Sequence, residues 1–384
     1  MAATLSRYLA ERHECRLIVF DTRRTDYPYG GELIDLRLPE PPPGSTWGRV
    51  IRITEAVRAL RQVRRRLGLE AVFSFNEPAN LPNVLTRSPE SRAIPVIGED
   101  KRYGQVGGLR RMAGDWLIRR YYGRADRIVA ASKGARETLI DKYGLDGANI
   151  DVIYNSIDPD AIAAAAAKPL TETEAALVAG PTIISAGRLT RAKGQWHLLR
   201  AMVEVRRRMP EAKLLILGEG ELGGYLRDLA TKLGLSDCAH FLGFQPNPHK
   251  FISRASVFAL SSLWEGFGMV VLESLAAGTA VVATDVRSGP REILAPTSDF
   301  RRGADGIEQA HYGLLTATPD GVFHGADVPP TPEERMLAEA ILRLLSDHSL
   351  RNSYSARGPV RAADFRADKL LPEYERSLQR ARKC

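Results

Sequence analysis

The chain has 384 residues, 44% of them hydrophobic and 26% charged, with a formal net charge of +8. This composition is ordinary for a globular protein, and the length favours two domains over one core. No apolar run approaches the roughly 20 residues of a membrane-spanning helix. Three scattered cysteines and seven histidines without ligand spacing argue against a disulfide framework or a metal centre, so we expect no metal and no cofactor.

Helices and strands alternate along the first half. Short apolar runs separated by helix-length segments are the pattern of a parallel sheet covered by helices. We expect helices at 1–12, 50–67, 109–122 and 133–143, and strands at 15–20, 33–36, 71–75, 94–97, 126–131 and 150–154. The stretch 161–179 is rich in alanine and lacks aromatic residues, which is typical of a linker, so we place a domain boundary near residue 168.

A loop with two bases follows the first strand of the second half. The segment A-G-R-L-T-R-A-K-G-Q at 186–195 joins the strand 182–185 to a helix at 196–208. Arg188 offers a bidentate fork and Lys193 a point charge, and glycines flank both, so the loop suits a diphosphate. Two solvated loop cations are the alternative interpretation.

The most informative stretch runs from 255 to 292. It predicts a strand at 257–260, a loop ending in E-G-F-G, a helix at 269–277 and a strand at 280–283. Glu265 lies in the loop and Glu273 on the second turn of the helix, so both can face the sheet edge where open α/β sheets bind ligands. The glycines and the helix N-terminus favour an anion. Carboxylates beside free amides suit a sugar nucleotide, although two surface charges would have the same spacing.

Two of these segments resemble a known family. The run E-G-F-G-M-V-V-L-E-S-L-A-A-G-T-A-V-V-A-T-D resembles the E-x(7)-E donor motif of family-4 retaining glycosyltransferases of the GT-B fold, and G-R-L-x(3)-K-G resembles their diphosphate-binding loop. S-G-P-R-E at 288–292 is similar to bacterial polysaccharide-assembly members. The resemblance implies an α/β fold with two Rossmann-like domains facing a central cleft. We expect an acceptor-side domain at 1–168, a nucleotide-sugar donor domain at 169–360 and a last helix at 361–384 that crosses back to the first domain.

The resemblance also implies roles for individual residues. Arg188 and Lys193 would hold the diphosphate and stabilise the leaving group, and Glu265 would contact sugar hydroxyls. The donor would further be bound by Glu273, at the ribose, and by Gly187, Gly243, Phe267, Gly268, Met269 and Val270. On the acceptor side the candidates are Asn76 and Glu99, the latter in a region where some relatives have a histidine that this chain lacks.

We therefore expect a retaining glycosyltransferase that moves a sugar from a UDP-linked donor to a lipid-linked or glycan acceptor in surface polysaccharide or glycoconjugate assembly. Two other functions stay open at this stage. A nucleotide-sugar epimerase of the same fold would bind the same donor without an acceptor. A non-catalytic sugar-nucleotide binding protein would bind the donor without turnover.

The positive charge is concentrated in two segments. V-R-A-L-R-Q-V-R-R-R-L at 57–67 contains five arginines, and residues 101–124 contain seven bases against one acid, interleaved with aromatic and aliphatic residues. Basic helices with aromatic residues suit an anionic membrane surface, so we expect a cytoplasmic protein on the inner face of the cell membrane. Arginines placed on any solvated face by a GC-rich gene are the alternative, and no nucleic-acid recognition motif accompanies the charge.

The start of the sequence departs from the family pattern. Relatives open with a strand and a glycine-rich loop before the first helix, whereas this sequence opens inside that helix. We therefore expect the first strand of the N-terminal domain to be missing, which removes ladder bonds from both neighbouring strands. The acceptor side should be incomplete, and the donor domain should be affected far less.

Overall fold

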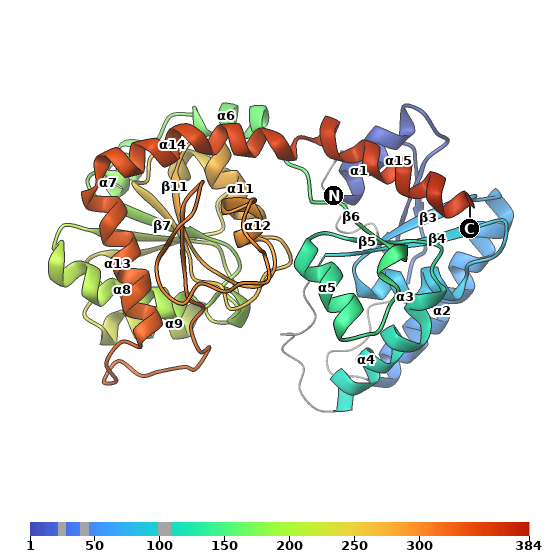
Figure 1. Cartoon of the computed structure of the whole chain (residues 1–384), viewed down its shortest axis with the longest axis horizontal. Coiled ribbons are helices and arrows are strands. Elements are labelled where there is room, and N and C mark those ends of the chain that lie inside the picture. Colours follow the sequence, from blue (N-terminus) through green and yellow to red (C-terminus); the bar gives the residue numbers. More distant parts are fainter. Residues whose placement is uncertain (22–27, 39–45, 99–108, 384) are drawn as a thin grey trace. The chain divides into compact units, whose positions relative to one another are not determined.

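The computed structural model describes residues 1–21, 28–38, 46–98 and 109–383. The chain forms two compact units, Met1–Ser156 with Ala367–Cys384, and Ile157–Arg366. Each unit is built on mainly parallel β-strands covered by helices, and α15 (Ala367–Lys383) belongs to the first unit although it ends the chain (Figure 1). The α/β class expected from the sequence is confirmed.

The first unit contains two separate parallel sheets. One has four strands in the order β3-β4-β5-β6, and the other pairs β1 with β2. The strands are β1 (Arg16–Val19), β2 (Glu32–Asp35), β3 (Ala71–Phe75), β4 (Arg92–Ile97), β5 (Ile128–Ala130) and β6 (Ile150–Val152). The helices are α1 (Ala2–Ala10), α2 (Thr46–Leu67), α3 (Glu77–Leu85), α4 (Leu109–Tyr121) and α5 (Lys133–Asp141), besides α15.

Two apolar clusters form the core of this unit. One joins α1 and α15 to the sheet through Ile94, Val96 and Val129, and its largest buried side chain is Tyr374, whose ring meets Phe73 edge-on at 5.7 Å between centroids. The other joins α3, α4 and α5 to the sheet and includes Val84, Ile97, Ile118, Tyr122, Ile128 and Leu139. Every residue of β5 is buried, because helices cover this part of the sheet.

Helix α3 lies where the sequence analysis predicted no element. Its two prolines hide the helical pattern, since proline at residue 82 cannot donate the main-chain hydrogen bond of a helix interior. Buried amides compensate: Asn80 donates to the carbonyl of Val96 at 3.1 Å, and Asn83 donates to that of Val72 at 2.8 Å. These side chains attach α3 to β4 and β3.

The stretch 161–179 is helical rather than an open linker. Helix α6 (Pro159–Ala166) begins after Asp158, which caps it, and α7 (Glu172–Val178) begins with a capping box formed by Thr171 and Glu174. Because α6 packs on α10 (His249–Ile252) and α11 (Met269–Ala276), it belongs to the second unit. Residues 157–168, which the sequence analysis placed in the first domain, therefore lie in the second.

The second unit has a seven-stranded sheet in the order β12-β13-β11-β10-β7-β8-β9. All neighbours are parallel except β12 and β13. The strands are β7 (Thr182–Ala186), β8 (Lys213–Leu217), β9 (Ala239–Gly243), β10 (Val257–Leu260), β11 (Ala280–Thr284), β12 (Glu308–Gln309) and β13 (Leu314–Thr316). The chain runs outward from β7 to β9 and then returns to the other side of β7 as β10. The switch point of the topology thus lies between β7 and β10, where open α/β sheets bind ligands.

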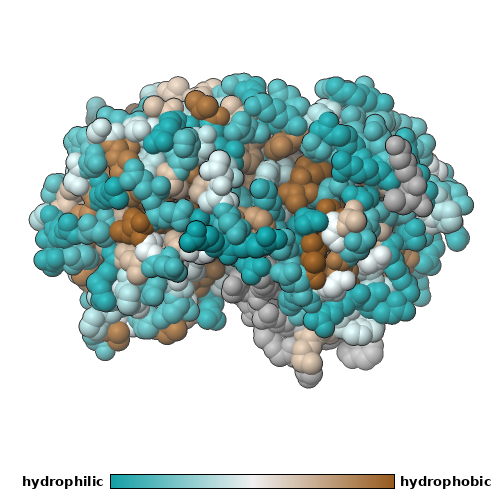
Figure 2. Space-filling model, viewed as in Figure 1, coloured by the Kyte–Doolittle hydropathy of each residue, from teal (hydrophilic) through white to brown (hydrophobic). Residues whose placement is uncertain are grey.

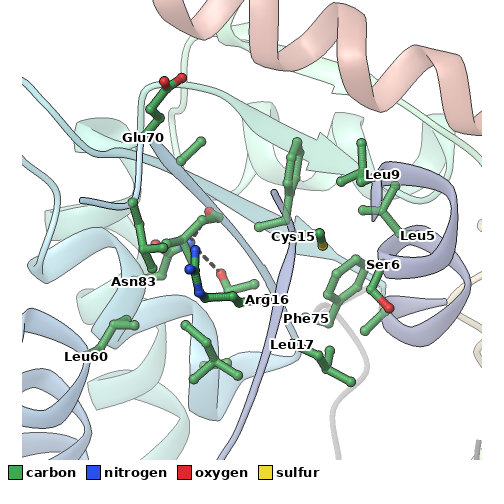
Figure 3. Close-up of a pocket in the computed structure, with 18 of the residues that line it drawn as sticks. Leu5, Ser6, Leu9, Cys15, Arg16, Leu17, Leu60, Glu70, Phe75 and Asn83 are labelled. Atoms are coloured by element: carbon green, nitrogen blue, oxygen red, sulfur yellow. Dashed lines mark hydrogen bonds between the residues drawn. The ribbon is translucent and has the colours of Figure 1, made fainter. Parts of the chain in front are cut away.

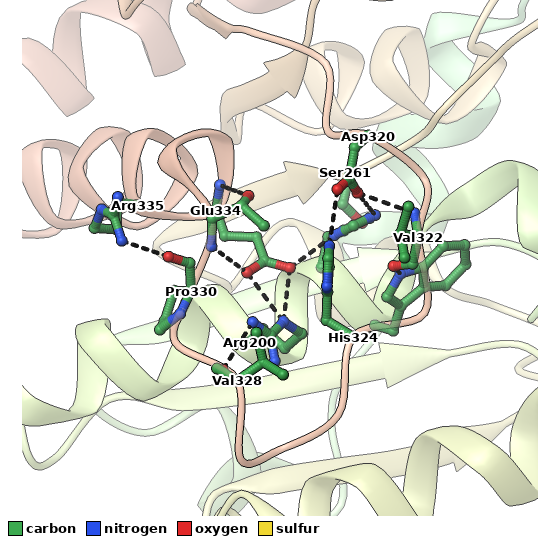
Figure 4. A network of polar contacts seen from close by, with 12 residues as sticks. Arg200, Ser261, Asp320, Val322, His324, Val328, Pro330, Glu334 and Arg335 are labelled. Carbon is green, nitrogen blue, oxygen red and sulfur yellow. Dashed lines mark hydrogen bonds and ion pairs between the residues drawn. The ribbon is translucent and has the colours of Figure 1, made fainter.

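Buried ion pairs fix the helix that follows β7. Helix α8 (Gln195–Arg208) carries Arg200, whose Nε donates to both carboxylate oxygens of Glu334 on α13 (Pro332–Ser346) at 2.8 and 3.0 Å (Figure 4). His197 Nδ1 lies 2.7 Å from the same carboxylate. Burial raises the pKa of Glu334, but the hydrogen bonds from His197 and Arg200 outweigh it and hold the pKa below its usual value. The carboxylate therefore stays charged, and α8 has a fixed position.

Candidate functional site

The loops that follow β7 and β10 meet at the switch point. Lys193 Nζ lies 2.5 Å from Glu265 Oε1, and the hydroxyl of Ser262 donates to the same oxygen at 2.6 Å. Glu265 is 8% exposed. The carbonyl of Ser262 accepts from the hydroxyl of Thr284, at the end of β11, at 2.6 Å. The sequence-predicted carboxylate is thus held by a cation and a hydroxyl on neighbouring strand ends.

Glycines allow these loops to approach closely. Gly194 has φ +57°, and a Cβ there would lie 2.3 Å from the carbonyl oxygen of Ser261. The hydroxyl of Ser261 donates to the carbonyl oxygen of Lys193 at 3.0 Å. The main-chain N–H of Leu263 donates to the carbonyl oxygen of Ala192 at 2.8 Å. The two loops are therefore connected by their main chains, and Lys193 has little freedom to move away from Glu265.

Arg188 differs from Lys193 in its surroundings. It is exposed, and no other described residue forms an ion pair with its guanidinium. Its carbonyl accepts from the side chain of Gln195 at 3.1 Å, which fixes the main chain behind it. Gly187, with φ +151°, precedes it at the end of β7. A cation that extends from a fixed loop without a protein partner can serve an anionic ligand.

Glu273 lies on α11, one helix turn beyond the free amides. Gly268 caps this helix in the left-handed conformation with φ +81°, so the main-chain N–H groups of Met269 and Val270 lie in the first turn, where no helical acceptor exists. Burial raises the pKa of Glu273, and the charge of Lys193 offsets part of this effect. Phe267 is buried, with its ring 5.6 Å from that of Phe365. A carboxylate and two free donors therefore share one end of α11.

The loops that follow β8 and β9 contact each other and the end of β7. The N–H of Gly218 donates to the carbonyl of Gly243 at 2.7 Å, and a Cβ at Gly218 would lie 2.1 Å from the carbonyl oxygen of Gly187. Gly243 itself has φ +66°. The next residue, Phe244, is 72% exposed, and its N–H donates to Glu219 Oε1 at 3.5 Å. Gly243 thus lies in the same set of strand-end loops as Gly187.

The S-G-P-R-E segment at 288–292 supports the fold around the site. Arg291 Nη2 lies 2.5 Å from Asp285 Oδ2 and 2.6 Å from Glu308 Oε2, and its side chain is 4% exposed. Burial raises the pKa of Asp285, although its bonds with Arg291 oppose the shift. These contacts fix the segment after β11 beside the start of α11. Arg291 is therefore a support of the fold here.

The acceptor-side candidates lie in the first unit. Asn76 follows β3 with φ +68° and ψ +156°, a backbone conformation unusual for a residue with a side chain. It lines a pocket of about 230 Å³ at the ends of β3 and β4, together with Glu77, Pro78, Asn80, Val96, Ile97 and Gly98. Glu99 lies outside the described residues. Residues in strained backbone conformations are concentrated at functional sites, so Asn76 remains a candidate for the acceptor side.

Sequence reasoning missed two residues that shape the strand-end loops of the second unit. Ser262 holds the Glu265 carboxylate, and Glu219 accepts from the main chain after Gly243. The signal for Ser262 was available: paired serines directly follow an apolar strand and precede the acidic residue. Within the described residues, no group of three or more His, Cys, Asp or Glu could hold a metal ion, and no described helix combines the length and the apolarity needed to cross a bilayer.

Two units of mainly parallel strands, the second with polar loops at its switch point, fit the class of GT-B proteins, and similarity to known families agrees with this class. Residues 1–161 match the family described as Glycosyltransferase Family 4, and residues 168–304 match Glycosyl transferases group 1. This chain belongs to the group 1, family-4 glycosyltransferases.

Individual relatives are distant. An uncharacterized glycosyltransferase of Methanocaldococcus jannaschii is 34% identical over 66% of this chain and 64% of its own length. A Campylobacter jejuni enzyme, N-acetylgalactosamine-N,N'-diacetylbacillosaminyl-diphospho-undecaprenol 4-alpha-N-acetylgalactosaminyltransferase, is 29% identical over 79% of this chain and 75% of its own. Anabaena HepE, solved with UDP and glucose, has a TM-score of 0.70 at 16% identity, covering 98% of this chain and 94% of HepE, which establishes a shared fold. The chain thus spans just under two thirds of the archaeal relative.

Proposed function

We propose that the chain is a retaining glycosyltransferase that moves a sugar from a UDP-linked donor to a hydroxyl of a lipid-linked or glycan acceptor in surface polysaccharide or glycoconjugate assembly. The observation that carries the proposal is the pair of Lys193 and Glu265 at the switch point. Beside it lie the N-terminal end of α11 and Arg188, for which no other described residue is an ion-pair partner. The names of two relatives support it, since one acts on a diphospho-undecaprenol acceptor and HepE was solved with UDP.

In this proposal the donor is held by three kinds of group. Arg188 and Lys193 bind the diphosphate, and Glu265 accepts from hydroxyls of the transferred sugar. Glu273 accepts from the ribose hydroxyls. The main chain contributes through Gly187, Gly243, Phe267, Gly268, Met269 and Val270. Acids beside cations suit a ligand that carries both hydroxyl and phosphate groups.

The reaction exchanges one bond at the anomeric carbon. The bond from this carbon to the diphosphate oxygen breaks, and a bond to the acceptor oxygen forms on the same face of the sugar. The acceptor proton passes to the departing phosphate oxygen, and UDP leaves. Arg188 and Lys193 stabilise the negative charge that develops on the diphosphate, which lowers the barrier to bond breaking. On the acceptor side, we propose that Asn76 and Glu99 contact the incoming substrate.

We further propose that the first unit binds an anionic membrane surface at the cytoplasmic face. The face in Figure 2 is mainly hydrophilic, yet α2 and α4 expose large apolar side chains: Val50 and Ile51 on α2, and Met112 and Trp116 on α4. Exposed arginines accompany them, including Arg65, Arg66, Arg119 and Arg120. Arg64 is an exception, because it is buried and donates to the carbonyl of Ser91 at 2.9 Å. Apolar and cationic groups together suit an anionic interface.

The decisive experiment incubates the protein with a panel of UDP-sugars, with and without lipid extracts and glycan acceptors. Transfer that depends on an acceptor, retains the anomeric configuration and is lost in Lys193→Ala supports the proposal. Lys232→Ala is the matched control, because Lys232 is an exposed lysine at the end of α9 (Gly223–Lys232). Epimerised sugar from the donor alone would identify an epimerase instead, and donor binding without turnover on any acceptor would identify a binding protein.

A further inference from the structure

The strand ends around Glu265 are closely packed. In the first unit, by contrast, a cavity of about 540 Å³ lies between β1 and β3, and its lining includes Leu5, Leu17 and Phe75 (Figure 3). In the second unit β10 pairs directly with both β7 and β11, and the polar residues at its carboxyl end and at that of β11 are buried: Ser261, Ser262 and Thr284. A side chain at these strand ends therefore has a fixed set of neighbours.

The two serines that follow β10 serve different loops. The hydroxyl of Ser261 donates to the carbonyl oxygen of Lys193 at 3.0 Å, whereas that of Ser262 donates to Glu265 Oε1 at 2.6 Å. Successive side chains of an extended segment point to opposite sides, so adjacent residues can reach two loops. Thr284 donates to the carbonyl oxygen of Ser262 at 2.6 Å. The main chain of Ser262 is thus held by the neighbouring strand, and its hydroxyl is directed at Glu265.

The two carboxylate oxygens of Glu265 have different surroundings. Oε1 meets two donors, Lys193 Nζ at 2.5 Å and the Ser262 hydroxyl at 2.6 Å. A carboxylate oxygen has about two lone-pair directions, so these donors occupy Oε1. None of the described residues donates to Oε2, and Oε2 is not one of the fully buried polar atoms that lack a partner. Oε2 is therefore the oxygen that remains for a ligand.

We propose that Ser262 is a positioning residue that sets the sugar specificity of the transferase by presenting Glu265 Oε2 in one orientation. The inference rests on the proposed function, in which Glu265 accepts from hydroxyls of the transferred sugar. Lys193 alone would leave the plane of the carboxylate undefined, because an ammonium is a point charge with rotatable donors. The Ser262 hydroxyl adds a second, fixed direction. Only a sugar hydroxyl with the matching position and configuration can then donate to Oε2, and its epimer leaves a polar group without its partner.

Binding of UDP and of two pairs of UDP-sugars to the 384-residue chain tests the proposal. UDP-glucose and UDP-galactose differ in the configuration of one hydroxyl, as do UDP-N-acetylglucosamine and UDP-N-acetylgalactosamine. UDP itself has no sugar and reports on the rest of the site. In Ser262→Ala we expect unchanged affinity for UDP in calorimetry. The ratio of affinities within the pair that the wild type discriminates should fall about fivefold, the effect of one ordinary hydrogen bond.

The matched control is Thr279→Val, which removes another buried hydroxyl. Thr279 precedes β11 at its amino end and donates to the carbonyl oxygen of Ile252 at 2.7 Å, so its loss should change neither UDP affinity nor the ratio. In a Glu265→Gln background, Ser262→Ala should have no further effect on the ratio, because the carboxylate that it orients is absent. If Ser262→Ala does not fold, Ser262→Cys keeps a weak donor of similar shape and should give an intermediate ratio.

The outcomes separate this inference from the proposed function. A ratio that changes in Glu265→Gln but not in folded Ser262→Ala would overturn the role of Ser262 and leave the proposed function intact. Equal losses for UDP and UDP-sugars in Ser262→Ala would also overturn it, since they indicate a general disturbance of the site. Equal affinity of the wild type for both members of each pair would do the same. Absence of UDP-sugar binding by the wild type would overturn the proposed function itself, and this inference with it.

Discussion

Lys193 and Glu265 come from loops after neighbouring strands, and their charged atoms lie 2.5 Å apart. The residue proposed to hold the diphosphate is therefore neutralised, before any donor arrives, by the residue proposed to bind the sugar. Arg188 has no such described partner. The two cations, although only five positions apart in the sequence, should respond differently to substitution.

Replacing the two cations should separate binding from stability. We expect Arg188→Ala and Lys193→Ala each to weaken UDP binding by about 1.5–3 kcal/mol, the contribution of a charge-assisted contact. Only Lys193→Ala should also lower the unfolding midpoint, because it leaves the buried Glu265 carboxylate without its cation. Calorimetry with UDP and thermal unfolding measure the two effects, with Lys232→Ala as the control. Unchanged UDP affinity in both variants would show that this loop does not bind the diphosphate.

The two carboxylates should be distinguished by the ligand used. We expect Glu273→Gln to weaken binding of UDP and of every UDP-sugar alike, because the ribose is common to all. Glu265→Gln should weaken binding of UDP-sugars in a manner that depends on the sugar, with little effect on UDP itself. Isosteric glutamine limits the disturbance of packing in both variants. Equal losses for UDP in the two variants would rule out this division of roles.

The raised pKa of Glu273 predicts a dependence of stability on pH. Because burial raises its folded-state pKa above the usual 4.5, the folded protein retains a proton that the unfolded chain releases. The contribution of Glu273 to the free energy of unfolding therefore decreases as the pH rises from about 4.5 through the folded-state pKa. We expect Glu273→Gln, which cannot ionise, to gain stability relative to the wild type across this window. Denaturant unfolding at several pH values measures the difference, and a pH-independent difference would contradict the prediction.

Arg200 should be essential for the fold of the second unit. Its removal leaves the buried Glu334 carboxylate with His197 as its remaining ion-pair partner among the described residues, and breaking a buried pair costs about 3–5 kcal/mol. We expect Arg200→Ala to lower stability by this amount in denaturant unfolding. Arg335→Ala is the control, since Arg335 lies next to the pair in sequence and is exposed, with a contact to the carbonyl of Pro330. Similar losses in both variants would mean that the buried pair contributes little.

Membrane binding should depend on α4. We expect the double variant Trp116→Ala, Arg120→Gln to dissociate from vesicles containing anionic lipid more readily than the wild type, with about 1 kcal/mol lost for the arginine. Added salt should also promote dissociation from the vesicles, because it screens the attraction between exposed arginines and anionic lipid, over about 8 Å at physiological ionic strength. Val360→Ala removes a side chain that is 67% exposed on α14 (His348–Ala362) and is the matched control. Vesicle sedimentation that is indifferent to both salt and the double variant would exclude this surface.

The sequence predicted those parts of the fold in which local pattern and tertiary structure agree. The strands β7, β10 and β11 are buried apolar runs, and α11 follows the glycines that end its loop. Helix α3 was missed because its two prolines oppose the helical pattern, and contacts made by Asn80 and Asn83 with strands distant in the sequence stabilise it. The pairing of Lys193 with Glu265 could not be predicted either, since it depends on which strands are neighbours and 72 positions separate the two residues.

Gly194 and Gly218 set limits on how the loops proposed to bind the donor can be altered. At each position a single added carbon would lie within 2.3 Å of a main-chain oxygen of another loop. A library that seeks new sugar specificity should therefore keep both glycines and vary exposed side chains such as Phe244, which is 72% exposed. In a saturation mutagenesis of this region, the smallest residues should tolerate the fewest replacements, so that the room for changing specificity lies around the glycine framework and not within it.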